Sequence, residues 1–282
     1  MADVRKIFVI LDPTTMNQPS LVMAETIVQD VVASGAKDIG LHLYACIAED
    51  AVRKPPGMNE DVARAEETSR IESWVERLAA HSRSLNVPVD TEVEIRPNWR
   101  EAITAAVGRQ PCWLAVKNMT DQSRLTRWIR ETSDWRLLRD AACPLLLVKA
   151  YARRHINKVL VAIKHRPETT TYRAANDQLL ETGRMIAKYV DAEMNVVTAY
   201  QEEDYPDRQR FADRCGLPRN QVWASLGKPE EVIAASANEI EADLVVIARV
   251  GKPGTGEKVG RTAEKVIDGL YCNIQVLPTA GE

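Results

Sequence analysis

A glycine-rich, basic segment in the last part of the chain has the residue types of a phosphate-binding loop. It follows an apolar run of strand length, contains Gly251, Gly254 and Gly260, and leads into an apolar helical pattern near Arg261. Small residues let backbone N–H groups approach an anion, and the N-terminus of a helix adds a favourable dipole. Lys252 and Arg261 could neutralise phosphate charge. The segment is therefore a candidate cradle for an anion or a nucleotide.

The same residues also fit a structural interpretation. Glycines supply positive φ angles in surface turns, and Thr262 can cap a helix, a contribution of about 1 kcal/mol that needs no ligand. Asp12 ends the apolar run 6–11 and is a second candidate ligand residue, but an Asp followed by Pro13 and Thr14 equally starts a turn. Both interpretations stay open for the loop and for Asp12.

Histidines and cysteines show no catalytic or metal-binding spacing. None of the histidines stands beside a nucleophile at an elbow motif, so structural or solvent-facing roles are expected. The cysteines are far apart and include no CxxC pair, which indicates neither a disulfide framework nor a zinc site. Cys143 and Cys272 precede matching strands and are expected to be packed rather than redox-active. The residues concerned are His42, His81, His155, His165, Cys46, Cys112, Cys143, Cys215 and Cys272.

Strand-length apolar runs alternate with helical patterns twice along the chain. The near-continuous runs 6–11 and 158–163 are typical of strands buried on both faces of a parallel sheet. Further strands are expected at 39–46, 87–95, 113–116 and 145–149 in the first half, and at 193–200, 221–224, 243–248 and 274–278 in the second. Helices are expected at 61–83, 100–107 and 230–239, among others.

The two halves match each other. Equivalent residues recur at one constant offset near their ends, and the second half is shorter in its middle, where the long helix 61–83 has only a short counterpart. The matching pairs are Ser133/Thr262, Leu137/Val266, Leu138/Ile267 and Cys143/Cys272. Alternating strands and helices imply right-handed crossovers and helices on both faces of the sheet. We therefore expect an α/β fold of two tandem, doubly wound, Rossmann-like domains, 1–150 and 151–282, each with a five-stranded parallel sheet.

The composition is that of an ordinary globular protein. Among 282 residues, 45% are hydrophobic and 27% charged, and the formal net charge is −3, which excludes a disordered chain and gives no electrostatic footprint for nucleic acid. The charged start and short first apolar run fit neither a secretory signal nor a membrane span. We expect a cytoplasmic protein that binds neither nucleic acid nor membranes.

Four segments, 132–139, 143–149, 227–233 and 262–268, carry a family signal when they are taken together. With them the chain resembles the universal stress protein family, in its tandem E-type branch, over nearly its whole length. The resemblance implies that the last strands of the two domains pair antiparallel about a pseudo-twofold axis. It also implies, for the family's ATP-binding members, a G-x2-G-x9-G-[ST] loop after strand four and an Asp at the end of strand one.

The glycine loop of the second half departs from that family pattern. It aligns as Ala248-x2-Gly251-x8-Gly260-Arg-Thr262, so the first glycine is an alanine and the second gap is one residue short. The domain 151–282 therefore carries a degenerate phosphate loop.

The two halves also differ in the residue at the end of their first strand. Asp12 matches the family's carboxylate, but the segment 117–124 after strand four of the first half contains no glycine. In the second half the position is Lys164, whose ammonium group accepts no hydrogen bond from a ribose hydroxyl and binds no magnesium. Each domain thus keeps half of a nucleotide site.

The sequence favours a tandem universal stress protein that acts in the cytoplasmic stress response by binding, with any ligand in the second domain. No catalytic residue, metal site or obligatory cofactor is assigned; ATP or another adenine nucleotide is the candidate ligand. The candidate binding residues are Gly251, Lys252, Gly254, Gly260, Arg261, Thr262 and Asp12.

Two other functions stay open. One is an adenine-nucleotide-binding protein with slow ATPase activity, in which the loop from Gly251 to Thr262 holds the phosphates, although no general base or magnesium carboxylate is evident beside it. The other is a protein–protein scaffold without a ligand. The expected partners are the two domains themselves through their last strands, with a homodimer and an unidentified protein partner left open.

Overall fold

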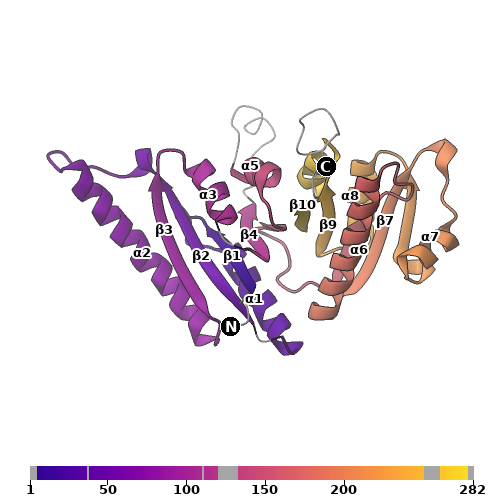
Figure 1. Cartoon of the computed structure of the whole chain (residues 1–282), viewed down its shortest axis with the longest axis horizontal. Helices are drawn as coiled ribbons and strands as arrows, with labels where there is room; N and C mark the ends of the chain where they lie inside the picture. The colour runs from indigo at the N-terminus through magenta and orange to yellow at the C-terminus, as the bar shows by residue number, and fades with distance from the viewer. Residues whose placement is uncertain (1–4, 37, 110, 120–132, 251–260, 279–282) are drawn as a thin grey trace. The chain divides into compact units, whose positions relative to one another are not determined.

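The computed structural model describes residues 5–36, 38–109, 111–119, 133–250 and 261–278; the side chains of 133–135, 261, 262 and 264 lie outside that description. The chain divides into two compact units, Met1–Ala150 (unit 1) and Tyr151–Glu282 (unit 2), which are coloured indigo to magenta and red to yellow in Figure 1. Each unit is an α/β layer structure, and each is described by itself below.

Unit 1 has five parallel strands in its described residues, in the order β3-β2-β1-β4-β5. The strands are β1 (Arg5–Leu11), β2 (Ile39–Ala48), β3 (Val89–Arg96), β4 (Leu114–Met119) and β5 (Leu145–Lys149). The helices are α1 (Pro19–Ala33), α2 (Glu60–Ser84), α3 (Trp99–Gly108) and α5 (Ser133–Asp140), with a short 3₁₀ turn, η1, at Glu49–Ala51. The strand order reverses at β1, which makes the sheet doubly wound.

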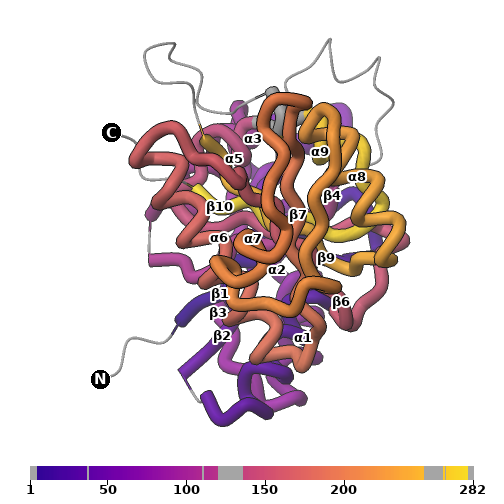
Figure 2. Tube along the Cα trace, turned by 90° about the vertical axis from the view of Figure 1, so that its right-hand side faces the viewer, coloured from indigo at the N-terminus to yellow at the C-terminus, as the bar shows by residue number. Residues whose placement is uncertain are grey.

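Unit 2 repeats this topology, with its described strands in the order β8-β7-β6-β9-β10, all parallel. The strands are β6 (Lys158–Ala162), β7 (Glu193–Tyr200), β8 (Val222–Leu226), β9 (Leu244–Arg249) and β10 (Asn273–Pro278). The helices are α6 (Thr170–Val190), α7 (Arg208–Cys215), α8 (Pro229–Glu239) and α9 (Arg261–Gly269), and the 3₁₀ turns are η2 (Glu202–Asp204) and η3 (Arg219–Gln221). Helices α8 and α9 pack side by side (Figure 2).

The central strands explain the continuous apolar runs of the sequence. The last five residues of β1 and the middle of β6 are buried, because helices cover both faces of the sheet in each unit. Helix α6 approaches its sheet closely: a Cβ added to Gly183 would meet Val161 Cγ2 at 2.5 Å and Met194 Cε at 3.0 Å. A glycine is needed there because no larger residue fits between the helix and β6.

The middle helices differ between the units, as the sequence predicted. Helix α2 has 25 residues and is capped at its start by Asn59, whose side chain accepts a hydrogen bond from the Asp61 N–H. Its counterpart α7 has 8 residues; Asp207 caps its start and Gly216, at a φ of 64°, ends it in the left-handed region. The α/β fold of two tandem doubly wound sheets is therefore confirmed.

The end of β4 is a correction to the sequence prediction. The strand was expected to stop at Val116, with a loop from Lys117, but Lys117 to Met119 continue the ladder and pair with Leu147 to Lys149 of β5. The apolar run stops earlier than the strand because hydrogen-bonded pairing continues where burial on both faces ends. Among the described helices, none has the length and apolar character needed to cross a bilayer.

Candidate functional site

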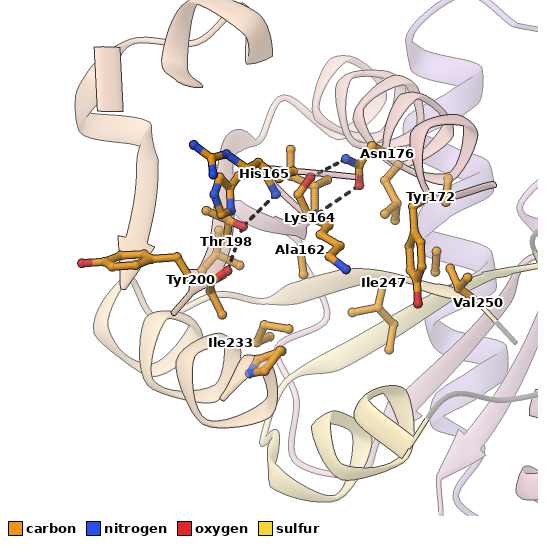
Figure 3. Close-up of a pocket in the computed structure, with 18 of the residues that line it drawn as sticks. Ala162, Lys164, His165, Tyr172, Asn176, Thr198, Tyr200, Ile233, Ile247 and Val250 are labelled. Carbon is orange, nitrogen blue, oxygen red and sulfur yellow. Dashed lines mark hydrogen bonds between the residues drawn. The ribbon is translucent and has the colours of Figure 1, made fainter. Parts of the chain in front are cut away.

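A cavity of about 580 Å³ lies at the carboxyl ends of the central strands of unit 2 (Figure 3). Its walls come from the ends of β6, β7 and β9 and from the helices α6, α8 and α9. Strand β6 lies between β7 and β9, so the cavity is at the point where the strand order reverses. Open α/β sheets bind their ligands at such switch points, and the volume is that of a small-molecule site.

Part of the cavity wall is apolar and buried. These side chains come from α6, β7, α8, β9 and α9 and from Ile163, just after β6, and together they can cover a flat ring or an aliphatic group. Filling such a surface removes apolar area from water, at about 25 cal/mol per Å². The residues are Ile163, Ala175, Leu179, Val197, Ile233, Ile247, Ala263 and Val266.

Lys164 lies two residues after the end of strand β6, and both its backbone and its side chain have bonding partners. Its N–H donates to Asn176 Oδ1 at 3.0 Å and its C=O accepts from Asn176 Nδ2 at 2.6 Å (Figure 3). Its Nζ lies 2.9 Å from Glu168 Oε1 and 4.7 Å from the centre of the Tyr172 ring. At the position where the family resemblance leads us to expect a carboxylate, this chain therefore has an ammonium group with fixed neighbours.

His165 is the next wall residue, and only 6% of it is exposed. Its N–H donates to Thr198 Oγ1 at 3.1 Å, and its C=O accepts from Arg214 Nη2 at 2.7 Å. Nε2 lies 3.1 Å from Asp204 Oδ2, yet neither ring nitrogen has hydrogen-bond geometry to a described atom. Burial lowers the pKa of His165 below its ordinary value, and the charge of Asp204 offsets part of this effect. The imidazole is therefore neutral near pH 7, with one donor and one acceptor nitrogen.

The charged groups of the cavity wall form ion pairs. Arg166 Nη1 contacts Asp204 Oδ1, and Lys164 contacts Glu168. Arg166 and Glu168 are mostly exposed, so these pairs are solvent-screened and exchangeable. An anionic ligand group could take the place of either carboxylate beside its cation.

Described residues on both sides of the predicted phosphate loop line this cavity. Val250, before the loop, and Ala263, after it, both line the wall. The predicted binding residues Gly251, Lys252, Gly254 and Gly260 lie outside the described residues. Arg261 and Thr262 form the first turn of α9, but their side chains are likewise outside the description.

Asp12 belongs to unit 1, and its side chain is engaged in a local turn. Its Oδ1 accepts from the Thr14 N–H at 2.9 Å and from Thr14 Oγ1 at 2.6 Å. Its own N–H donates to Gln18 Oε1 at 3.0 Å, and its C=O accepts from Gln18 Nε2 at 2.7 Å. The turn interpretation thus has direct support, while a ligand role for Asp12 stays a prediction.

Several wall residues were not singled out as ligand residues from the sequence. His165 was expected to be structural or solvent-facing, although its place in the loop that follows strand β6 was a usable signal. Tyr172, Asn176 and Thr198 gave no signal, because they reach Lys164 and His165 from other elements.

Curated relatives of the chain share one name. It is 30% identical to the Universal stress protein E homolog of Haemophilus influenzae, over 67% of this chain and 69% of the relative. It is 28% identical to Universal stress protein E of Escherichia coli K12, over 98% of this chain and 95% of the relative. No protein-family model matches the chain.

Solved structures share the fold over the whole chain. A functionally unknown protein from Pseudomonas aeruginosa PAO1 has a TM-score of 0.75 at 22% identity, covering 98% of this chain and 93% of that one. A universal stress protein from Archaeoglobus fulgidus has a TM-score of 0.74 at 16% identity, covering 99% and 97%. With the repeated fold and the relatives that match it at nearly full length, the chain belongs to the universal stress protein family and is of the tandem type.

Proposed function

We propose that the protein is a cytoplasmic stress-response module that acts by binding, and that the unit-2 cavity holds an adenine nucleotide without rapid turnover. The observation that carries the proposal is the cavity at the switch point of β6 and β9, with wall residues at both ends of the glycine-rich segment 251–260. Ligand sites of doubly wound folds occur at this place, and glycine-rich segments that lead into a helix bind phosphates.

The described wall offers complementary groups for such a ligand. Its apolar part suits a base, and Thr198 and His165 supply hydroxyl and imidazole groups for directional hydrogen bonds. Lys164 and Arg166 supply positive charge for phosphate oxygens in exchange for their present ion pairs. The glycines of 251–260 would add backbone N–H groups, as the sequence predicts.

Binding is favoured over turnover by the charges at the cavity. The two carboxylates of the described wall, Glu168 and Asp204, lie beside the cations Lys164 and Arg166, and Lys164 stands where the family resemblance expects a carboxylate. A carboxylate that positions magnesium is a recurring requirement of phosphoryl transfer. Lys164 supplies charge without a metal, so nucleotide binding should not depend on magnesium.

The test is a calorimetric titration of the full chain with ATP, with magnesium or with a chelator, together with an assay for released phosphate. Ala248, half-buried in the cavity wall, is changed to Phe to fill the site; Ala235→Phe, exposed on α8, is the matched control. We expect one saturable site per chain in the wild type and in Ala235→Phe, unaffected by the chelator, and none in Ala248→Phe.

Two results would overturn parts of this account. If ATP, ADP and AMP all fail to saturate the wild-type chain, the cavity is not a nucleotide site. If magnesium-dependent phosphate release accompanies binding with many turnovers per minute, the protein is an enzyme and the binding-only assignment is wrong.

A further inference from the structure

Two cysteines that are far apart in the sequence come together in unit 1. Cys112 precedes β4 and Cys143 precedes β5, and their Sγ atoms are 3.1 Å apart. Both are thiols; Cys143 is buried and Cys112 is partly exposed. The pair lies at the amino ends of β4 and β5, away from the carboxyl ends where ligands bind. Neither residue lines the unit-2 cavity.

The backbone brings the two sulfurs within bonding reach. Strands β4 and β5 are parallel neighbours, with Ala115 paired to Leu145 and the Ala115 N–H donating to Pro144 O at 2.9 Å. Extended back from this pairing, the register places Cys143 level with Trp113, so Cys112 is offset from Cys143 by one residue. With neighbouring strands about 4.8 Å apart and a rise of about 3.3 Å per residue, that offset corresponds to a Cα separation of roughly 5.8 Å, which a disulfide can span. Shortening the sulfur–sulfur distance from 3.1 Å to the roughly 2.0 Å of a disulfide needs only a side-chain adjustment of about one ångström.

We propose that Cys112 and Cys143 are a thiol–disulfide exchange site, which closes reversibly to an intramolecular disulfide when a low-molecular-weight disulfide of the glutathione type is the oxidant. The thiolate of one cysteine attacks the oxidant, forms a mixed disulfide and releases one thiol. The second cysteine, as its thiolate, attacks the protein sulfur of that mixed disulfide and releases the second thiol. Two protein thiols are oxidised, and one external disulfide is reduced to two thiols.

The local chemistry supports a reactive pair. A hydrogen bond between the sulfurs lowers the pKa of the Cys143 thiol and raises that of Cys112, so one thiolate is stabilised by its neighbour. Partial exposure of Cys112 gives an oxidant access to the pair. In a reducing compartment such a disulfide is transient, which is the behaviour of a redox-responsive site rather than of a structural bridge.

Unit 2 provides a built-in comparison. Leu145 pairs with Ala115 in unit 1 as Ile274 pairs with Val245 in unit 2, so Cys272 is the counterpart of Cys143. By the same register Ala242 is the counterpart of Cys112. The dithiol is thus a property of unit 1 and was not predicted by the spacing of the cysteines.

The test uses the full chain, equilibrated in glutathione buffers of increasing oxidised fraction, quenched with acid, alkylated and digested with trypsin. Cys112 and Cys143 fall in separate tryptic peptides, 110–117 and 140–149, so a disulfide joins two identifiable peptides. We expect this linked pair to appear in a chain that runs as a monomer on a non-reducing gel, and to disappear with dithiothreitol. Cys272→Ser should leave unchanged the glutathione ratio at which half of the chains carry the disulfide. Cys112→Ser should abolish the linked peptide pair.

The wild-type result decides the proposal without relying on a variant. If both thiols remain alkylated at the most oxidising ratio, if each carries glutathione separately, or if the link joins two chains, the proposal is wrong.

Discussion

The side-chain amide of Asn176 binds both backbone groups of Lys164: it accepts from the N–H at 3.0 Å and donates to the C=O at 2.6 Å. The other unit has the same device at its equivalent position, where Gln18 accepts from the Asp12 N–H and donates to the Asp12 C=O. In each unit a side-chain amide further along the chain fixes the backbone of a residue just beyond the first strand: Asp12 is one residue after β1 and Lys164 two residues after β6. What differs between the units is the side chain so positioned, a carboxylate in unit 1 and an ammonium in unit 2.

Replacing either amide should lower stability, but only the change in unit 2 should also weaken nucleotide binding. Asn176→Leu removes two hydrogen bonds to the backbone of Lys164, and Gln18→Leu removes two to the backbone of Asp12 and a third to the Thr15 C=O. Each change should lower the free energy of unfolding of its own unit by about 1–3 kcal/mol. Only Asn176→Leu should also weaken nucleotide binding, because Lys164 lies at the cavity. Urea unfolding followed by hydrogen exchange in each unit, with calorimetry, measures both effects. Equal loss of binding in the two variants would argue against a unit-2 site.

A side chain at Gly183 should destabilise unit 2. Ala at this position places Cβ 2.5 Å from Val161 Cγ2, and such overpacking costs about 1–3 kcal/mol, offset in part by the better helix propensity of Ala. Gly108→Ala, at the end of α3, is the matched control, because a Cβ there meets nothing within 4 Å. We expect Gly183→Ala to lower the melting temperature and Gly108→Ala to leave it unchanged or raise it slightly. A melting temperature that is higher in Gly183→Ala than in Gly108→Ala would show that α6 is not tightly packed against β6.

His165 should make unit 2 less stable in mild acid. Its folded pKa is lowered by burial, so the unfolded chain binds the proton more readily once the pH falls below about 6.5. The stability is complete above that pH and is lost as the pH falls toward the folded pKa. In His165→Gln the difference in unfolding free energy between pH 7.5 and pH 5.5 should be smaller; the exposed His81→Gln is the comparison variant. An unchanged difference in His165→Gln would contradict a buried neutral imidazole.

Pairing of the two units through their last strands remains a prediction from the family resemblance. Strands β5 and β10 are each largely apolar and buried, and an open apolar edge strand invites association. A protease site inserted between Ala150 and Tyr151 allows the folded chain to be cut after purification. The two fragments should stay together on size exclusion; elution as two separate monomers would show that the units do not pair.

The sequence predicted the parts of the fold that depend on burial. Strands β1 and β6 were found from continuous apolar runs, and the short α7 from the missing residues of the second half. The end of β4 was missed because Lys117 and Asn118 are polar, although the ladder continues through them. Hydrogen-bonded pairing has no signature in hydrophobicity once one face of the sheet becomes accessible.

The sequence led to some residues that line the cavity but not to the side chains that contact them. The rule that ligands bind beyond the strand ends led to Lys164 and to the segment 251–262. Lys164 and Ala263, the residue after that segment, line the cavity. The amide of Asn176 and the hydroxyl of Thr198 depend on helix phase and strand register, which one sequence does not reveal. The approach of Cys112 to Cys143 was hidden for the same reason.

Native mass spectrometry of the purified full chain, before and after addition of ATP, tests the central claim most directly. A ligand-binding cavity in unit 2 predicts a mass increase of one nucleotide per chain in the wild type and in Ala235→Phe, with or without magnesium, and none in Ala248→Phe. A bare chain mass that ATP leaves unchanged, or an equal mass increase in Ala248→Phe, would contradict it.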